Sequence, residues 1–259
     1  MSSVPKHLAP KNATAIVIPA RFASTRFPGK PLHLLAGKPM LRHVWERCLE
    51  CRVAGRVIIA TDDIRIQSAA IAFGADVVMT RTDHPTGTDR IVEVLQAVPE
   101  IQTVLNVQGD EPLAPPELME RLLLGLQERP ACDMITAAVP TEDSARMTDP
   151  NVVKVVTSTT GRALYFSRAS IPYDRSNAHP AARFLWHKGI YGYRREFLLK
   201  FVAWPASPLE QSEQLEQLRA LENGAYIHVL ETDDIAPGVD TPEQAAEVEA
   251  LMLQAARTL

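Results

Sequence analysis

Residues 15–31 read Ala15-Ile-Val-Ile-Pro-Ala-Arg21-Phe-Ala-Ser24-Thr-Arg26-Phe-Pro-Gly29-Lys30-Pro31, a short apolar run followed at once by a basic loop. Ala15 to Ile18 suit a buried parallel strand, and Pro19 ends its ladder because proline has no amide hydrogen to donate. The loop then supplies three cations and two hydroxyls, from Arg21, Arg26, Lys30, Ser24 and Thr25. Gly29 permits a tight turn. The pattern predicts a loop that holds phosphate groups, with a solvated basic turn as the alternative.

The rest of the first half alternates strand-like and helix-like periods. Strands are expected at 14–18, 56–61, 76–80, 103–108 and 134–139, and helices at 39–51, 64–73, 88–97 and 116–127. This alternation is typical of βαβ units, so it predicts an α/β fold with a doubly wound, mostly parallel sheet. Ligands bind such sheets beyond the carboxyl ends of the strands. The loops after Ile18 and Val107 are therefore expected at the working edge.

The pattern changes from Asn151 onward. Strand-like runs at 152–156 and 163–166, a loop at 171–182 and a strand at 184–194 indicate a small α+β insertion over 151–195. A helix at 209–222, a strand at 226–231 and a terminal helix at 241–257 follow. Thr241 is the expected N-cap of the last helix, and Gln244 completes a capping box. We expect a single domain over 13–259, with 1–12 as a leader of no assigned function.

Bulk composition excludes several classes of protein. With 27 basic and 31 acidic residues and no long run of either sign, the chain lacks the charge pattern of a nucleic-acid binder. No apolar stretch approaches the roughly 20 residues that cross a bilayer. We therefore expect a cytoplasmic protein without stable membrane association. Cys48, Cys51 and Cys132 are too few for a disulfide framework, and the helical spacing around Cys48-x-x-Cys51 favours buried thiols over a metal site.

Two carboxylates follow predicted strand ends. Asp110 lies in Leu105-Asn-Val-Gln108-Gly109-Asp110-Glu111-Pro112, and Asp240 lies between a glycine turn and the terminal helix. Mg²⁺ favours one or two carboxylates together with substrate phosphates and water. The pair is therefore a candidate magnesium site. A turn or cap role for Asp240 is the alternative.

Eight motifs in a common order resemble the 3-deoxy-manno-octulosonate (Kdo) cytidylyltransferase family. They are IPARFASTRFPGKPL at 18–32, TRTDHPTGTDR at 80–90, NVQGDEP at 106–112, NVVKVV at 151–156, ALYFSRASIPYDR at 163–175, HKGIYGYR at 187–194, SPLEQSEQLEQLR at 207–219 and GVDTPE at 238–243. The resemblance covers nearly the whole chain. It implies transfer of CMP from CTP to the anomeric hydroxyl of Kdo, which gives CMP-Kdo for lipopolysaccharide biosynthesis.

The resemblance also implies residue roles. For CTP, the matching positions are Arg21, Ser24, Lys30, Arg81, Thr86 and Gly87, although Thr86 stands where serine is commoner. For Kdo, they are Gln108, Arg168, His187, Tyr191, Glu216 and Gln217. Asp110 and Asp240 would ligate Mg²⁺, with two ions per site, and Arg21, Lys30, Asp110 and Asp240 would carry the catalysis.

Other interpretations of these residues and of the chain stay open. His187 could be a hydrogen-bonded core histidine, Tyr191 a packing residue, and Glu216 with Gln217 a solvated helix face. The acceptor could be another acidic sugar, such as 8-amino-Kdo or neuraminic acid. A nucleotide-sugar-dependent glycosyltransferase and a non-catalytic nucleotide-binding protein are the rivals from other classes.

The 151–195 segment further indicates a homodimer. Its aromatic residues exceed what a small flap needs for its own core, and exposed apolar surface usually marks an interface. The residues concerned are Tyr165, Phe166, Phe184, Trp186, Tyr191 and Tyr193. A segment that folds back over its own sheet is the alternative.

Overall fold

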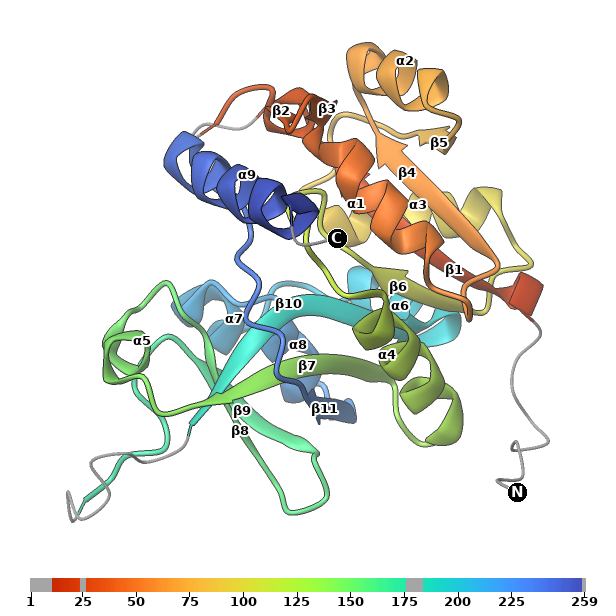
Figure 1. The fold of residues 1–259 in the computed structure, drawn as a ribbon. Coiled ribbons are helices and arrows are strands. Elements are labelled where there is room, and N and C mark those ends of the chain that lie inside the picture. The colour runs from red at the N-terminus through yellow and green to blue at the C-terminus, as the bar shows by residue number, and fades with distance from the viewer. Residues whose placement is uncertain (1–10, 24–26, 176–183, 258–259) are drawn as a thin grey trace, which may run out of the picture. The chain divides into compact units, whose positions relative to one another are not determined.

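The computed structural model describes residues 11–23, 27–175 and 184–257 (Figure 1). The chain forms two compact units. We call residues 9–121 with 235–259 the flanking unit, and residues 122–234 the central unit. The 151–195 segment lies within the central unit, and its description as an insertion into one domain stays a prediction.

The flanking unit is built around a parallel sheet of the order β6-β1-β4-β5. Its strands are β1 Thr14–Ala20, β4 Arg56–Thr61, β5 Asp76–Met79 and β6 Thr103–Asn106. Its helices are α1 Met40–Leu49, α2 Ile64–Ala72, α3 Gly87–Ala97 and α9 Pro242–Arg257. Short elements complete it: η1 Lys11–Ala13, η2 Lys30–Leu32 and the hairpin β2 Leu34–Leu35 with β3 Lys38–Pro39.

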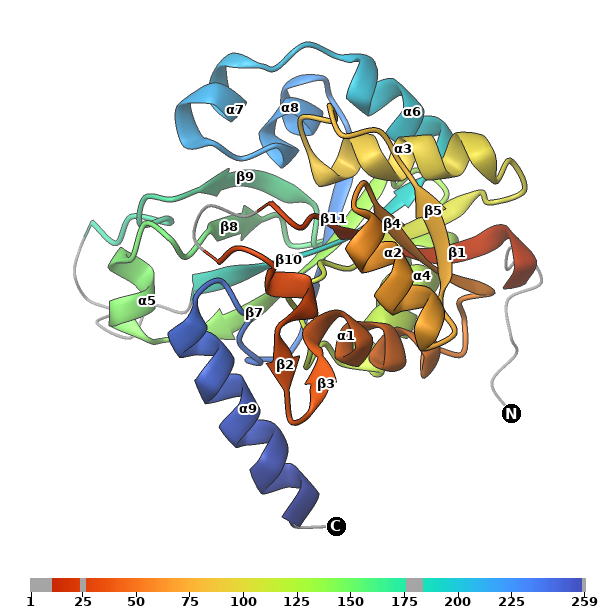
Figure 2. The ribbon, with the colours of Figure 1, turned by 90° about the horizontal axis from the view of Figure 1, so that it is seen from above.

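Helices cover both faces of this sheet. The chain moves outward from β1 through α1, β4 and α2 to β5, then returns through α3 to β6 on the other side of β1. Because such crossovers are right-handed, reversing the direction puts the next helix on the opposite face. Figure 2 shows α1 and α2 on one side of the strands and α3 on the other. This confirms the α/β fold with flanking helices, and the reversal places the switch point beside β1, where such sheets bind ligands.

The central unit has a mixed sheet. Strand β7 Met134–Thr141 pairs parallel with β11 Ile227–Glu231 and antiparallel with β10 Phe184–Arg194. Strand β8 Lys154–Thr157 pairs antiparallel with both β10 and β9 Ala163–Ser167. Its helices are α5 Ser144–Thr148, α6 Arg195–Ala203, α7 Pro208–Glu213 and α8 Gln217–Glu222. Helix α4 Pro116–Glu128 runs from the flanking unit into the central one.

The helix expected at 209–222 is wrong as one element. The structure divides it into α7 and α8, because Gln214 adopts the left-handed conformation, with φ 54°, and ends α7 there. A residue of this conformation cannot continue a right-handed helix. Further elements were not expected from the sequence: α5, α6, the β2–β3 hairpin and the short helices η1 and η2.

The three cysteines are buried free thiols, as expected. Burial raises the pKa of the Cys48 thiol well above its ordinary value, and proximity to Cys51 adds to this effect. Among the described residues, none of the helices combines the length and apolar content needed to cross a bilayer.

Helix α9 packs against the segments that lie between β1 and α1. Its buried residues join a cluster of six: Phe27, Leu35, Met40, Val239, Ala245 and Val248. The predicted capping box is confirmed, since the Gln244 side chain accepts from the Thr241 amide at 3.2 Å and the Thr241 hydroxyl accepts from the Gln244 amide at 3.4 Å. The cap and the buried Val239 on either side of Asp240 hold that residue in place.

We expect Val248→Ala to lower the free energy of unfolding by about 2 kcal/mol, because a fully buried side chain would leave a cavity. Leu251, on the same helix and 46% exposed, is the matched control, and Leu251→Ala should stay within about 0.5 kcal/mol of the original chain. Urea denaturation measures both. Equal effects would contradict docking of α9 through Val248.

Candidate active site

The structure brings three of the predicted catalytic residues together in the flanking unit. The Lys30 ammonium donates to Asp110 Oδ2 at 2.6 Å, to Asp240 Oδ1 at 3.2 Å and to the Val239 carbonyl at 2.9 Å. Lys30 is largely buried, with 14% of its side chain exposed, whereas the carboxylates retain 30% and 46%. A cation buried to this extent requires paired charges and hydrogen bonds. Three segments that are distant in sequence thus converge on one charge cluster.

Backbone geometry explains how these segments come so close. Gly29, with φ 72°, turns the chain into η2 and donates to the Phe22 carbonyl at 3.0 Å, which closes the loop after β1. A Cβ on Gly109 would lie 3.1 Å from the Pro19 carbonyl oxygen, which is tighter than most such contacts, so glycine favours the close approach of the loop after β6 to β1. The Val239 amide in turn donates to the Asp110 carbonyl at 2.9 Å.

The two carboxylates fit a cation site, because a cation already lies between them in the form of the Lys30 ammonium. The capping of α9 is done by Thr241 and Gln244, and the Asp240 carboxylate points to Lys30 instead. The described residues contain no group of three or more His, Cys, Asp or Glu side chains arranged to hold a metal. A divalent ion here would therefore take its remaining ligands from substrate and water, as Mg²⁺ commonly does.

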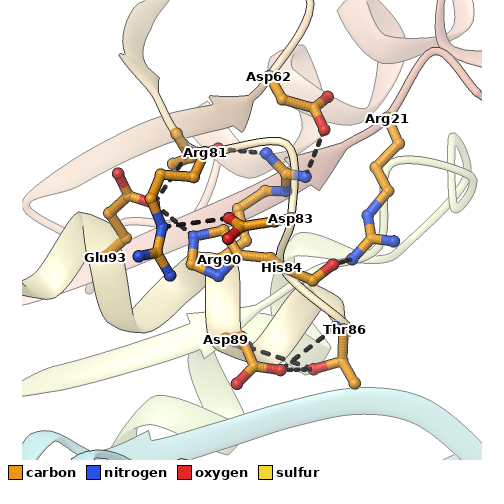
Figure 3. Close-up of polar contacts among 10 residues, drawn as sticks. Arg21, Asp62, Arg81, Asp83, His84, Thr86, Asp89, Arg90 and Glu93 are labelled. Atoms are coloured by element: carbon orange, nitrogen blue, oxygen red, sulfur yellow. Dashed lines mark hydrogen bonds and ion pairs between the residues drawn. The ribbon is translucent and has the colours of Figure 1, made fainter.

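The residues expected to face CTP surround a second loop at the same edge. Arg21 donates to the His84 carbonyl at 2.9 Å, which joins the loop after β1 to the loop after β5 (Figure 3). Arg81 is 68% exposed in its side chain and pairs with Asp83 at 3.3 Å. Thr86 is the N-cap of α3: its hydroxyl accepts from the Thr88 and Asp89 amides at 3.2 and 3.3 Å. Ser24 lies outside the described residues.

Gly87 and Gln108 complete the predicted residues of the flanking unit. A Cβ on Gly87, the first residue of α3, would lie 3.4 Å from Pro19 Cγ, so this helix start is close to the end of β1. The Gln108 side-chain Nε2 donates to Asn106 Oδ1 at 3.3 Å, and the Gln108 main-chain carbonyl accepts from the Glu111 main-chain amide at 3.2 Å. These contacts shape the turn that carries Asp110.

The other predicted Kdo residues lie in the central unit. A bulge in β10, between Lys188 and Tyr191, is filled by the Thr136 hydroxyl, which lies 3.1 Å from the Lys188 carbonyl and 2.8 Å from the Ile190 carbonyl. His187 Nε2 is 3.0 Å from the same hydroxyl. The Thr136 hydroxyl has one hydrogen, which it donates to a carbonyl oxygen, so it must accept from the His187 ring. We therefore assign the His187 Nε2–H as donor to Thr136 Oγ1.

His187 is buried and neutral. Burial, with a smaller contribution from the charge of Lys188, lowers the pKa of its imidazole to about 3. Its ring packs against Phe166 and Tyr191, with centroid distances of 5.0 and 5.3 Å. This is the environment of the hydrogen-bonded core histidine considered above, so a contact with substrate would use a neutral ring.

Tyr191 and Glu216 are near enough to influence one another. Burial raises the pKa of the Tyr191 phenol well above its ordinary value, and the charge of Glu216 adds to this. Glu216 accepts from the Arg219 guanidinium at 3.1 Å. A solvated face is wrong for Gln217, which is only 4% exposed at the start of α8.

Arg168 uses its guanidinium on the main chain in this structure. It donates to the carbonyls of Glu213 at 2.8 Å, Pro150 at 2.9 Å and Gln214 at 3.4 Å. The Glu213 carboxylate accepts from the Arg168 amide at 2.9 Å. Arg168 therefore fixes the end of α7 to the end of β9, and its role toward a sugar carboxylate stays a prediction.

Comparison with known proteins identifies the family. The sequence profile described as cytidylyltransferase matches residues 15–231. A 3-deoxy-manno-octulosonate cytidylyltransferase of Syntrophotalea carbinolica is 52% identical over 241 residues, which cover 90% of this chain and 96% of the relative. The Escherichia coli protein of the same name is 48% identical over 239 residues, covering 92% and 96%.

The chain belongs to the 3-deoxy-manno-octulosonate cytidylyltransferase family. It is thus a member of a nucleotidyltransferase family. A solved structure of CMP:2-keto-3-deoxy-manno-octonic acid synthetase complexed with CTP superposes with a TM-score of 0.90 at 46% identity, covering 93% of this chain and 99% of that one. A 4-diphosphocytidyl-2C-methyl-D-erythritol synthase from Anaerococcus prevotii, at 14% identity and TM-score 0.63, shares the fold alone.

The environment of His187 predicts a pH effect. Its imidazole has a pKa of about 3 in the folded protein and about 6.5 in the unfolded chain. Between these values the unfolded chain binds the extra proton, so the contribution of His187 to stability is complete above pH 6.5 and is lost as the pH falls toward 3. NMR titration of the His187 ring should show a neutral ring across pH 5 to 8. A transition near pH 6.5 would contradict its burial.

Proposed function

We propose that this chain transfers CMP from CTP to the anomeric hydroxyl of Kdo and releases pyrophosphate. The observation that carries the proposal is the meeting of Lys30 with Asp110 and Asp240 beyond the carboxyl ends of β1 and β6. Relatives named for this acceptor align over nearly their whole length, which supports Kdo rather than another acidic sugar.

In the proposed reaction, the anomeric oxygen forms a bond to the α-phosphorus while the bond to the β-phosphate breaks, and the hydroxyl proton leaves to solvent. The phosphate oxygens are anionic and repel an incoming nucleophile, so positioning and preorganised charge carry most of the barrier reduction. In the described part of the loop after β1, Arg21 and Lys30 are the cations that would stabilise the negative charge of the phosphates. Arg81, in the loop after β5, is exposed to solvent.

We further propose that Asp110 and Asp240 hold the magnesium. A bound Mg²⁺ supplies charge neutralisation on phosphate oxygens and lowers the pKa of a coordinated hydroxyl. The Lys30 ammonium lies between these carboxylates, so a bound metal would compete with Lys30 for them. An ammonium displaced in this way would be available to pair with a phosphate oxygen. The number of ions per site, two by resemblance, stays part of this proposal.

The direct test is pyrophosphate release from CTP and Mg²⁺ with a panel of acidic sugars. We expect release with Kdo to exceed release with 8-amino-Kdo and neuraminic acid. Release with neuraminic acid alone would place the chain with another acceptor. CTP-independent turnover of a nucleotide sugar would favour a glycosyltransferase.

Asp110→Asn and Asp240→Asn should each lower kcat by roughly a hundredfold or more, because a preorganised charge contact typically contributes about 3 kcal/mol to transition-state stabilisation. Asp76→Asn is the matched control, since this carboxylate pairs with Arg56 away from the site. Near-normal turnover of both site variants at saturating Mg²⁺ would show that the metal assignment is wrong.

We also propose that the protein is a homodimer. Three of the aromatic residues expected at the interface, Phe166, Phe184 and Tyr193, are instead buried within the central unit. Two other apolar side chains support an interface instead: Leu164 is 59% and Tyr173 84% exposed. Sedimentation at low micromolar concentration should give twice the 28.6 kDa chain mass. A fully active monomer would exclude the dimer.

A further inference from the structure

One face of α3 is devoted to holding the loop that precedes it. We call residues 80–86 the β5–α3 loop. The residues concerned are Thr86, Asp89, Arg90 and Glu93, whose spacing of three, four and seven positions puts them on one side of a helix. Figure 3 shows their side chains directed toward the loop, together with Arg21.

Arg90 secures the beginning of the loop. Its side chain is fully buried, and it donates to Asp62 Oδ2 at 2.8 Å and to the Thr80 hydroxyl. The Thr80 amide also donates to the Thr61 carbonyl at 2.8 Å. A buried guanidinium is tolerated only with partners of this kind. The ends of β4 and β5 are thereby tied to α3.

Glu93 secures the middle of the loop through two contacts at one atom. Its Oε2 accepts from the Arg81 amide at 3.0 Å and from His84 Nε2. Burial by itself raises the pKa of Glu93, but the hydrogen bonds from His84 and from the Arg81 amide outweigh it and lower the pKa overall. The group is an anion across the neutral range, and its hydrogen bonds are charge-assisted.

The far side of His84 faces the loop after β1. The His84 carbonyl accepts from Arg21 at 2.9 Å, and the His84 residue is only 8% exposed. The Arg81 side chain remains 68% exposed, and its pair with Asp83 is a surface pair of little energetic weight. Glu93 thus fixes the main chain of Arg81, while the Arg81 guanidinium stays accessible to solvent.

We propose that Glu93 is a positioning residue for nucleotide binding: its carboxylate holds Arg81 and His84 in the conformation that meets CTP. The proposal rests on the proposed function, because it takes CTP as the ligand of this loop. If the loop is already ordered in the free protein, CTP binding does not have to supply the free energy of ordering it. Loss of Glu93 should therefore weaken the affinity for CTP and leave the chemical step unchanged.

Glu93→Ala should raise the KM and the dissociation constant for CTP by about tenfold or more, since a lost charge-assisted hydrogen bond is commonly worth one to two powers of ten. We expect kcat and the KM for Kdo to change by less than about threefold. Glu93→Gln keeps an acceptor for the Arg81 amide and should fall between Glu93→Ala and the original chain. His84→Phe removes the other partner and should raise the KM for CTP in the same direction.

Glu120→Ala is the matched control. Glu120 lies on α4 rather than on α3. Its carboxylate also accepts a hydrogen bond from a main-chain amide of a loop, that of Arg52, at 2.7 Å. Its removal should leave the KM for CTP within about twofold of the original value. The proposal is overturned if Glu93→Gln and His84→Phe both keep the original KM for CTP, or if the KM values for CTP and Kdo rise equally.

Titration calorimetry with CTP and no sugar separates this proposal from the proposed function. If the original chain does not bind CTP, the proposed function fails. If it binds CTP and the Glu93 and His84 variants bind equally well, only the positioning role fails. Should Glu93→Ala not fold, Glu93→Gln and His84→Phe still decide the matter.

Discussion

The contact on which the site depends is the Lys30 ammonium between Asp110 and Asp240. Two carboxylates directed to the same place repel each other, and a cation between them offsets that repulsion. The ammonium supplies that cation at 2.6 and 3.2 Å. The loop after β1, the loop after β6 and the segment before α9 are each anchored by it, and Gly29 and Gly109 supply the close approach that it needs.

The same contact connects fold with chemistry. A pair of carboxylates arranged around a lysine is also arranged around the position where a divalent ion would neutralise them. In the proposed reaction the ammonium that stabilises the free protein becomes the cation that meets the phosphates. Around it, the α3 face with Arg90 and Glu93 fixes the neighbouring loop, so the flanking unit presents a charge arrangement set before substrate arrives.

Much of the flanking unit could be predicted because apolar periodicity records which face of each element is buried. Ile16 to Ile18 are buried as expected, and so are Ile91, Val94 and Leu95. The short strands and helices were harder. Helix α6 is not among the predicted helices, although Phe197, Leu198 and Phe201 have helical spacing, because the strand predicted up to residue 194 ends immediately before it. The break at Gln214 depends on its positive φ, and a glutamine gives no sequence signal for that conformation.

The candidate site shows a similar division. Motif order pointed to Lys30, Asp110 and Asp240, and the structure joins them. The residues predicted from sequence do not include Asp62, His84, Arg90 and Glu93, since an ion pair between a helix and two strand ends forms only when the chain has folded. Two of them, His84 and Arg90, lie in the motif TRTDHPTGTDR at 80–90, where Arg90 places a charge within an apolar helical stripe. No pattern in the sequence indicates that the Arg168 guanidinium donates to main-chain carbonyl oxygens.

The most direct test of the central claim is the affinity of the protein alone for Mn²⁺, a magnesium substitute that electron paramagnetic resonance detects. Lys30→Met leaves the two carboxylates without their internal cation, so the variant should bind Mn²⁺ more tightly than the original chain by about tenfold or more. Lys38→Met is the control, because Lys38 pairs with Glu46 at the surface, and it should bind Mn²⁺ as the original chain does. Unchanged or weaker Mn²⁺ binding by Lys30→Met would contradict the account, since lysine and metal would then not share the two carboxylates.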